Sequence, residues 1–127
     1  MALRKTIIAT GQYYHIFNRG VARNPIFFCN KDYERFLLSL NYYQYKDPPV
    51  RLSYFLKMEL KEKENILKEM RNNNQKIINI HCYSLMPNHY HLLLKQEEDF
   101  GIESFICRAV NGYVKYLNIR NKRVGPL

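Results

Sequence analysis

An apolar run that carries two histidines constrains the fold of this chain more than any other feature. Residues 85–94 read LMPNHYHLLL, a composition that predicts a buried β-strand. Because alternate side chains of a strand share a face, His89 and His91 are expected to point the same way, opposite to Tyr90. Two neutral imidazoles on one rigid face can bind a divalent cation. The pair alone leaves a second interpretation open, in which both are ordinary half-buried histidines bonded to backbone carbonyls or carboxylates.

The length and the composition predict a single domain over residues 1–127, too short to hold a second catalytic module. No apolar stretch reaches membrane-spanning length, and the N-terminus lacks the apolar core of a secretory signal. We therefore expect a cytoplasmic protein with no membrane partner. Cys29, Cys82 and Cys107 are widely spaced, which favours reduced packing residues over a disulfide framework or a zinc knuckle.

The charge balance favours a polyanionic partner. Twenty Lys and Arg residues against eleven Asp and Glu residues give a net charge of +9, which suits nucleic acid through phosphate contacts and counterion release. The eleven tyrosines and seven phenylalanines can supply stacking surfaces for unpaired bases, although most of them must serve the core. Basic composition for the sake of solubility is the alternative.

Three strands are predicted from alternation and aromatic content. The first covers residues 13–20 and ends at a glycine, and the second covers residues 77–85. The corner at residues 86–88 joins the second strand to the histidine strand as a tight hairpin, where Asn88 is expected to hold the corner rather than to contact a ligand. His15 would neighbour the histidine pair if the first strand lies beside the histidine strand, but Tyr13, His15 and Phe17 could equally form one packed face, and packing is the favoured interpretation. His81 is interpreted as a structural residue.

Helical spacing of apolar residues predicts two amphipathic helices and a charged insertion. Asn30 is the expected N-cap of the first helix, Asp32 lies in its first turn, and residues 47–49 stop it. Residues 53–71 are rich in Lys and Glu and read as a solvated helix with a ragged apolar stripe. The last helix starts from Gly101.

The order of these elements predicts an α+β fold of the ferredoxin-like type, β-α-β-β-α(-β), with an antiparallel sheet. The inserted charged helix follows the first helix, and the last strand is expected to be missing or to lie beyond Leu127. In this plan the histidine strand lies near the centre of the sheet and the final helix covers one face.

Two segments then resemble the signatures of a known family. Residues 14–20 (YHIFNRG) and 83–94 (YSLMPNHYHLLL) are similar to the signatures of the REP-associated tyrosine transposases, relatives of the small insertion-sequence transposases of the HUH superfamily. Residues 113–118 and the basic turn up to Gly125 also resemble that family's helix after the histidine strand. The resemblance spans nearly the whole chain, and the inserted helix falls where these proteins vary in length.

The resemblance implies a DNA transposase domain that binds single-stranded or hairpin DNA and cleaves and rejoins strands through a 5′-phosphotyrosine. A magnesium or manganese ion on His89 and His91 would polarise a phosphate oxygen, and manganese suits imidazole ligands better. No third ligand is identified. Related insertion-sequence enzymes are dimers, so a homodimer is one expectation. The candidate DNA contacts are basic residues of the first strand, the last helix and the turn after it: Arg19, Arg108, Lys115, Arg120, Lys122 and Arg123.

The chain departs from the family at the nucleophile. In relatives the nucleophilic tyrosine lies on a later helix, after the point that Leu127 reaches, so we expect a C-terminally truncated domain. Tyr113 and Tyr116 are the substitutes in the last helix, but both match positions that the family uses structurally. Two hypotheses remain. The first is a metal-dependent transposase domain whose nucleophile is supplied by missing sequence, and the second is a catalytically inactive remnant that binds single-stranded or hairpin DNA. A zinc hydrolase is disfavoured, because no acidic residue at ligand spacing accompanies the histidine pair.

Overall fold

The computed structural model describes residues 7–73 and 75–121, and its element order agrees with the predicted α+β plan. The elements are β1 (Tyr13–Arg19), the short 3-10 helix η1 (Val21–Arg23), α1 (Asn30–Tyr43), α2 (Leu52–Lys57), α3 (Leu60–Asn72), β2 (Ile78–Met86), β3 (His89–Gln96) and α4 (Gly101–Asn121).

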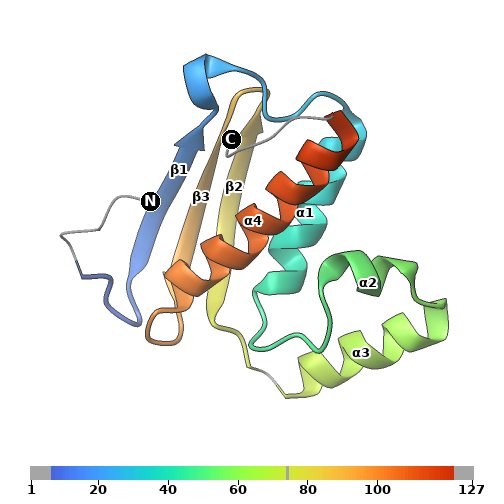
Figure 1. The fold of residues 1–127 in the computed structure, drawn as a ribbon. Coiled ribbons are helices and arrows are strands. Elements are labelled where there is room, and N and C mark those ends of the chain that lie inside the picture. The colour runs from blue at the N-terminus through green and yellow to red at the C-terminus, as the bar shows by residue number, and fades with distance from the viewer. Residues whose placement is uncertain (1–6, 74, 122–127) are drawn as a thin grey trace.

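The three strands form one antiparallel sheet in the order β1-β3-β2, which confirms that the histidine strand is central. Pro87 and Asn88 are the only residues between β2 and β3, so the predicted tight hairpin is also confirmed. Helices α1 and α4 lie together on one side of the sheet (Figure 1). In the described ranges the other side of the sheet has no helix, and we call it the open face.

The core lies between the sheet and helices α1 and α4. Along β3, residues at even-numbered positions are buried and those at odd-numbered positions are only half-buried, as the alternation of a strand requires. Tyr90 packs its ring 5.1 Å from that of Phe36 on α1, and Phe36 lies 5.1 Å from the ring of Tyr113 on α4. The aromatic residues of the chain therefore serve mainly to hold the helices on the covered face.

The N-terminus of α1 differs from the prediction. Helix α1 begins at Asn30, so the N-cap is Cys29, whose side chain makes no capping hydrogen bond. Asp32, the third residue of the helix, reaches back instead, and its Oδ2 accepts a hydrogen bond of 2.7 Å from the backbone N–H of Phe28, which precedes the N-cap. This bond ties the segment before α1 to the first turn of the helix.

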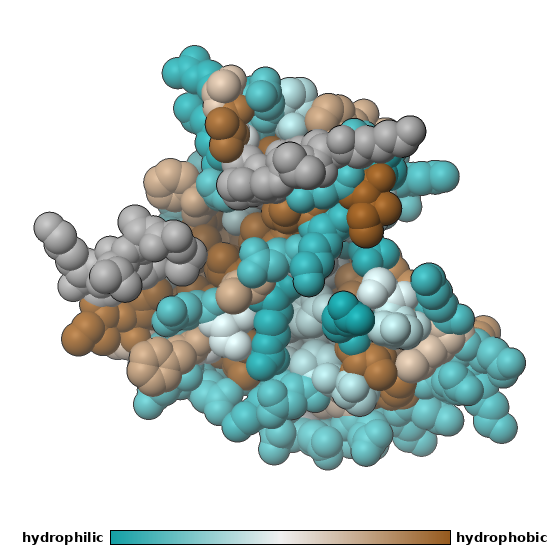
Figure 2. All heavy atoms as spheres, viewed as in Figure 1, coloured by the Kyte–Doolittle hydropathy of each residue, from teal (hydrophilic) through white to brown (hydrophobic). Residues whose placement is uncertain are grey.

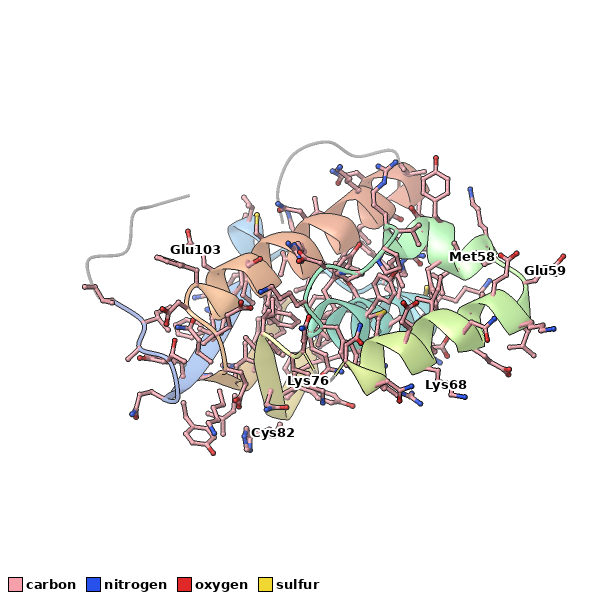
Figure 3. All side chains as sticks on the ribbon, turned by 90° about the horizontal axis from the view of Figure 1, so that it is seen from below. Met58, Glu59, Lys68, Lys76, Cys82 and Glu103 are labelled. Carbon is pink, nitrogen blue, oxygen red and sulfur yellow. The ribbon has the colours of Figure 1, made fainter. Side chains whose placement is uncertain are left out.

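The charged insertion is two helices rather than one. The backbone is extended at Met58 and Glu59, which separates α2 from α3, and Figure 3 shows both residues at this bend. Both helices surround a second small core whose members are Tyr42, Tyr45, Leu52, Phe55 and Met70. The ragged apolar stripe of the sequence reflects this arrangement, since each helix contributes only one or two residues to that core.

The helix side of the molecule is largely hydrophilic. Figure 2 shows polar residues over α3 and across the outer surface of α4, with apolar residues confined to smaller areas. Among the helices in the described ranges, none has both the length and the apolar character needed to cross a bilayer.

Candidate functional site

Five side chains of β1 and β3 gather at one end of the open face. In the register of the sheet, Arg19 is directly opposite His89, and Phe17 is directly opposite His91. Directly opposed residues of an antiparallel pair point to the same side. His15, two residues before Phe17, therefore shares this side. Strand β2 adds residues to the same face, and Figure 3 shows its Cys82 pointing away from helix α4.

His89 and His91 lie next to each other on this face, which confirms the predicted shared direction. Their ring centroids are 5.1 Å apart and the rings are nearly perpendicular, at 89°. Both side chains are half-buried, so neither is enclosed by the core. The pair is thus accessible to an ion or a substrate at the open face.

The hydrogen bond of His89 fixes which ring nitrogen is free. His89 Nδ1 lies 2.7 Å from Oδ1 of Asn88, and an amide oxygen can only accept, so His89 Nδ1 carries the proton. The Asn88 amide nitrogen faces the carbonyl oxygen of Arg23 at 3.4 Å, which supports this orientation of the amide. The lone pair of His89 Nε2 is left available.

His91 has an equivalent partner in His15. His91 Nδ1 lies 2.7 Å from His15 Nε2, and the two rings stack with centroids 4.9 Å apart and planes 16° apart. When His91 donates in this bond, its own Nε2 keeps a lone pair, like that of His89. Metal-binding histidines commonly have the non-ligating nitrogen held in this way by a neighbouring acceptor.

The pKa of His91 is lowered from its usual value. Partial burial is the largest cause, and the charges of the two neighbouring histidines and of Arg19 lower it further. A lower pKa keeps the imidazole neutral, and only the neutral ring can donate a lone pair to a cation. The surroundings of His91 therefore favour the form that a metal ligand requires.

Adding His15 to the pair does not complete a metal centre made of protein ligands alone. Within residues 7–73 and 75–121, no group of three or more His, Cys, Asp or Glu side chains is arranged to hold a metal ion. His15 Nε2 is directed at His91 rather than at open space.

The hairpin corner that carries Asn88 is held by the segment after β1. The N–H of Gly20 donates to the carbonyl oxygen of Asn88 at 2.8 Å, and the N–H groups of Ile26 and Phe27 both donate to that of Pro87. Gly20 is required there, because a Cβ atom on it would lie 2.2 Å from the backbone oxygen of Asn24. The expected role of Asn88 at the corner is confirmed, and the same residue orients His89.

The structure places the two candidate tyrosines far from the histidine pair. Tyr113 is fully buried between the sheet and the helices, and its hydroxyl donates to the carbonyl oxygen of Ile26. Tyr116 donates to Oδ1 of Asp32 at 3.0 Å. Burial is the main cause that raises the pKa of both hydroxyls. The covered face thus separates both tyrosines from the open face that carries the histidines.

The candidate DNA contacts divide between the two sides. Arg19 lies on the open face beside His89, whereas Arg108, Lys115 and Arg120 belong to α4 and line a cavity on the helix side. Arg120 also forms an ion pair of 2.7 Å with the fully buried Asp32. Lys122 and Arg123 lie outside the described residues.

The open face therefore offers two imidazoles that are anchored at Nδ1, next to an exposed guanidinium. Such a set can hold a divalent cation and an anionic oxygen close together. Sequence reasoning found the pair and Arg19 but assigned His15 to packing, because the register that brings β1 beside β3 is not written in either strand alone. Comparison of the chain with family models, with curated proteins and with solved structures finds no match.

Proposed function

We propose that this chain is a DNA transposase domain of the kind that its two signatures resemble. It binds single-stranded or hairpin DNA at the open face and supports metal-dependent strand cleavage and rejoining. The observation that carries the proposal is the anchoring of both imidazoles at Nδ1, that of His89 by Asn88 and that of His91 by His15. Nε2 of His89 keeps its lone pair, and Nε2 of His91 keeps its own when His91 is the donor to His15.

His89 and His91 are the residues that would hold magnesium or manganese. When bound, the ion supplies a Lewis acid for a phosphate oxygen. Arg19, opposite His89, supplies a guanidinium that can bind the same phosphate group. Asn88 and His15 keep the two rings in position, so that little rearrangement accompanies binding.

The exposed aromatic rings of the open face favour single-stranded DNA. Phe17 and Tyr13 of β1 are 67% and 53% exposed, and they lie on either side of His15. Exposed rings on a sheet surface can stack with unpaired bases, which a closed duplex does not present. The three cysteines are free, as predicted, but all three are exposed, so their assignment as packing residues was wrong. Free thiols fit a reducing compartment.

A second candidate function is DNA binding without cleavage. The hydroxyls of Tyr113 and Tyr116 are both committed to partners inside the molecule, which favours this alternative for the described residues. Under the first proposal, the attacking tyrosine is neither of these two. The two candidates make the same prediction for DNA binding and opposite predictions for covalent chemistry.

The test uses a labelled DNA hairpin with single-stranded flanks, incubated with the protein and manganese and run on a denaturing gel. A covalent protein–DNA adduct that His89→Ala abolishes and His81→Ala preserves supports the transposase proposal. Binding without an adduct supports the second candidate. Absence of binding at low salt contradicts both. An adduct lost in Tyr113→Phe or Tyr116→Phe would overturn the placement of these tyrosines as structural residues.

A further inference from the structure

A cavity of about 910 Å³ lies on the helix side of the molecule, between α1, α4 and residues 48–53. That segment is fixed against α1 by two hydrogen bonds. The Tyr42 hydroxyl donates to the carbonyl oxygen of Val50 at 2.6 Å, and the N–H of Leu52 donates to the Tyr43 hydroxyl at 3.1 Å. The cavity is thus a built feature of the fold and lies on the side opposite to the histidines.

The lining of this cavity is strongly basic. Within the described ranges it contains five basic residues and no acidic one, and the five are Arg35, Arg51, Arg108, Lys115 and Arg120. Two of them have carboxylate partners behind or beside the cavity, since Arg120 pairs with Asp32 and Arg108 lies 3.5 Å from Asp47.

Arg35, Arg51 and Lys115 are the cations of the cavity that have no carboxylate partner. In the described part of the chain, none of the three lies within ion-pair distance of a carboxylate. The Arg35 guanidinium lies 5.1 Å from the ring centroid of Tyr116, so its position is fixed by an aromatic face rather than by an opposite charge. Unpaired positive charge in a concave site attracts anionic ligands.

Most of the remaining lining is apolar, and its uncharged polar members include Ser39, Ser53 and Asn111. Tyr43 and Tyr116 contribute rings, and Pro48, Pro49 and Ile119 contribute aliphatic surface. The volume lies within the range of sites that enclose small organic ligands. Aromatic and apolar walls combined with guanidinium groups suit a base together with its phosphates. An acidic peptide would use the cations but leave these walls without a partner.

We propose that this cavity binds an unpaired nucleotide and its flanking phosphates from single-stranded DNA. The proposal rests on the proposed function only in taking DNA as the partner, because it involves neither the histidines nor a metal. The open face and the cavity then hold two separate parts of one strand, which passes around the edge of the sheet.

The test measures binding of a fluorescein-labelled twelve-nucleotide oligothymidylate by anisotropy, without metal. Arg35→Gln combined with Lys115→Gln should weaken binding about 10- to 100-fold and reduce the slope of log affinity against log salt by about 1.4, which is two single-strand phosphate contacts. The matched control is Lys61→Gln with Lys68→Gln, which removes the same charge from α3, outside the cavity lining. Figure 3 shows Lys68 on α3, and this control should bind within about threefold of the wild type.

A variant that fills the cavity without changing its charge tests whether DNA enters the cavity. Gly112 lines the cavity, and a Cβ atom on it would meet only Tyr43 and Ser39, at 3.7 and 3.9 Å. Gly112→Leu places a larger, uncharged side chain in the lining and is expected to weaken binding by occupying the cavity. A thermal melt of each variant checks that the fold persists.

Several results would overturn this inference. They are wild-type affinity in the Arg35/Lys115 variant, an equal loss in the α3 control, wild-type affinity in Gly112→Leu, and equal binding of a blunt duplex or a polyglutamate competitor. If any of these is found while the histidine-dependent adduct forms, the cavity inference fails and the proposed function stands. If the cavity variants lose binding as expected and no adduct forms, the cavity inference stands and the cleavage proposal fails.

Discussion

Two side-chain hydrogen bonds decide which nitrogen each imidazole of the pair presents to the open face. In the bond between His89 and Asn88 only His89 can donate, because the partner atom is an amide oxygen. In the bond between His91 and His15 either ring can be the donor. Metal binding at His91 Nε2 requires His15 to accept, so His15 acts as a positioning residue. The effect of such partners on metal affinity is typically 10- to 100-fold.

We expect His15→Ala to lower manganese affinity about tenfold, because the His91 ring loses the acceptor that fixes its tautomer. Calorimetric titration of manganese into the protein measures this. His15 is exposed, so the variant should fold. His81→Ala is the matched control, since His81 is an exposed histidine that instead contacts the ring of Tyr13. Equal manganese affinity in the His15 variant and the wild type would show that His15 does not position His91 for metal binding.

Asp32 has a larger structural role than the sequence predicted. Its carboxylate is fully buried and accepts hydrogen bonds from the Phe28 N–H, Tyr116 and Arg120. Burial alone would raise the pKa of Asp32, but these three donors outweigh burial and lower the pKa below its usual value. From sequence, Asp32 was expected only to complement the helix dipole. Its partners on α4 are more than eighty residues away along the chain and could not be inferred.

Asp32→Asn should lower the free energy of unfolding by roughly 3 kcal/mol at neutral pH, because it leaves Arg120 without its buried counter-charge. The folded pKa of Asp32 lies below the unfolded one, so its contribution is complete above about pH 4 and is lost as the pH falls further. Urea unfolding at several pH values measures both effects, and the variant should lose part of the acid dependence. Glu34→Gln, an exposed change on the same helix, serves as the control and should have little effect.

At the scale of elements, the segment between β1 and α1 links the first strand to the hairpin corner. Gly20 approaches Asn24 so closely that a Cβ atom has no space, and its N–H donates to Asn88. The same corner residue then orients His89. The glycine that ends the first strand in sequence thus supports the position of a side chain in the site.

Gly20→Ala is expected to reduce the free energy of unfolding by roughly 2 kcal/mol or more, because the backbone of Asn24 must move. Chemical denaturation measures the loss, and manganese affinity should fall with it as the corner shifts. Gly112→Ala is the matched control, since a Cβ atom there meets nothing closer than 3.7 Å and alanine favours the helix. A Gly20 variant as stable as the wild type would contradict the proposed role of this contact.

The elements differ in how far the sequence predicts them. The alternation of β3 was predictable because every second residue from Tyr90 to Gln96 faces the core. The bend at Met58 was not, because Lys and Glu continue through it without a proline or glycine. The pairing of β1 with β3 depends on contacts across the whole chain, which is why His15 was assigned to packing instead of to His91.

At the scale of the molecule, the sheet separates two basic surfaces. The open face carries the histidines with Arg19, and the helix side carries the basic cavity. The net charge of +9 led us to expect a polyanionic partner. The sequence did not predict how the basic residues are distributed between the two sides of the sheet. The cavity brings Arg35 of α1 together with Arg51 of the segment before α2 and with basic residues of α4, and that is a property of tertiary packing.

Binding of single-stranded DNA should depend steeply on salt. With about four phosphate contacts shared by the two surfaces, affinity should fall about 10- to 100-fold between roughly 50 and 200 mM salt, because each contact releases counterions. Anisotropy of a labelled oligonucleotide over a salt series measures the slope. A flat response would contradict a phosphate-based interface on either surface.

The most direct test of the central claim is a manganese titration followed by NMR of the histidine side chains, with the oligonucleotide absent. Manganese broadens signals of nuclei close to it, so the account predicts that the ring signals of His89 and His91 disappear first, while those of His81 persist. His89→Ala with His91→Ala should abolish the tight binding. Uniform broadening of all four histidines, or unchanged affinity in the double variant, would contradict the claim that this pair holds the metal.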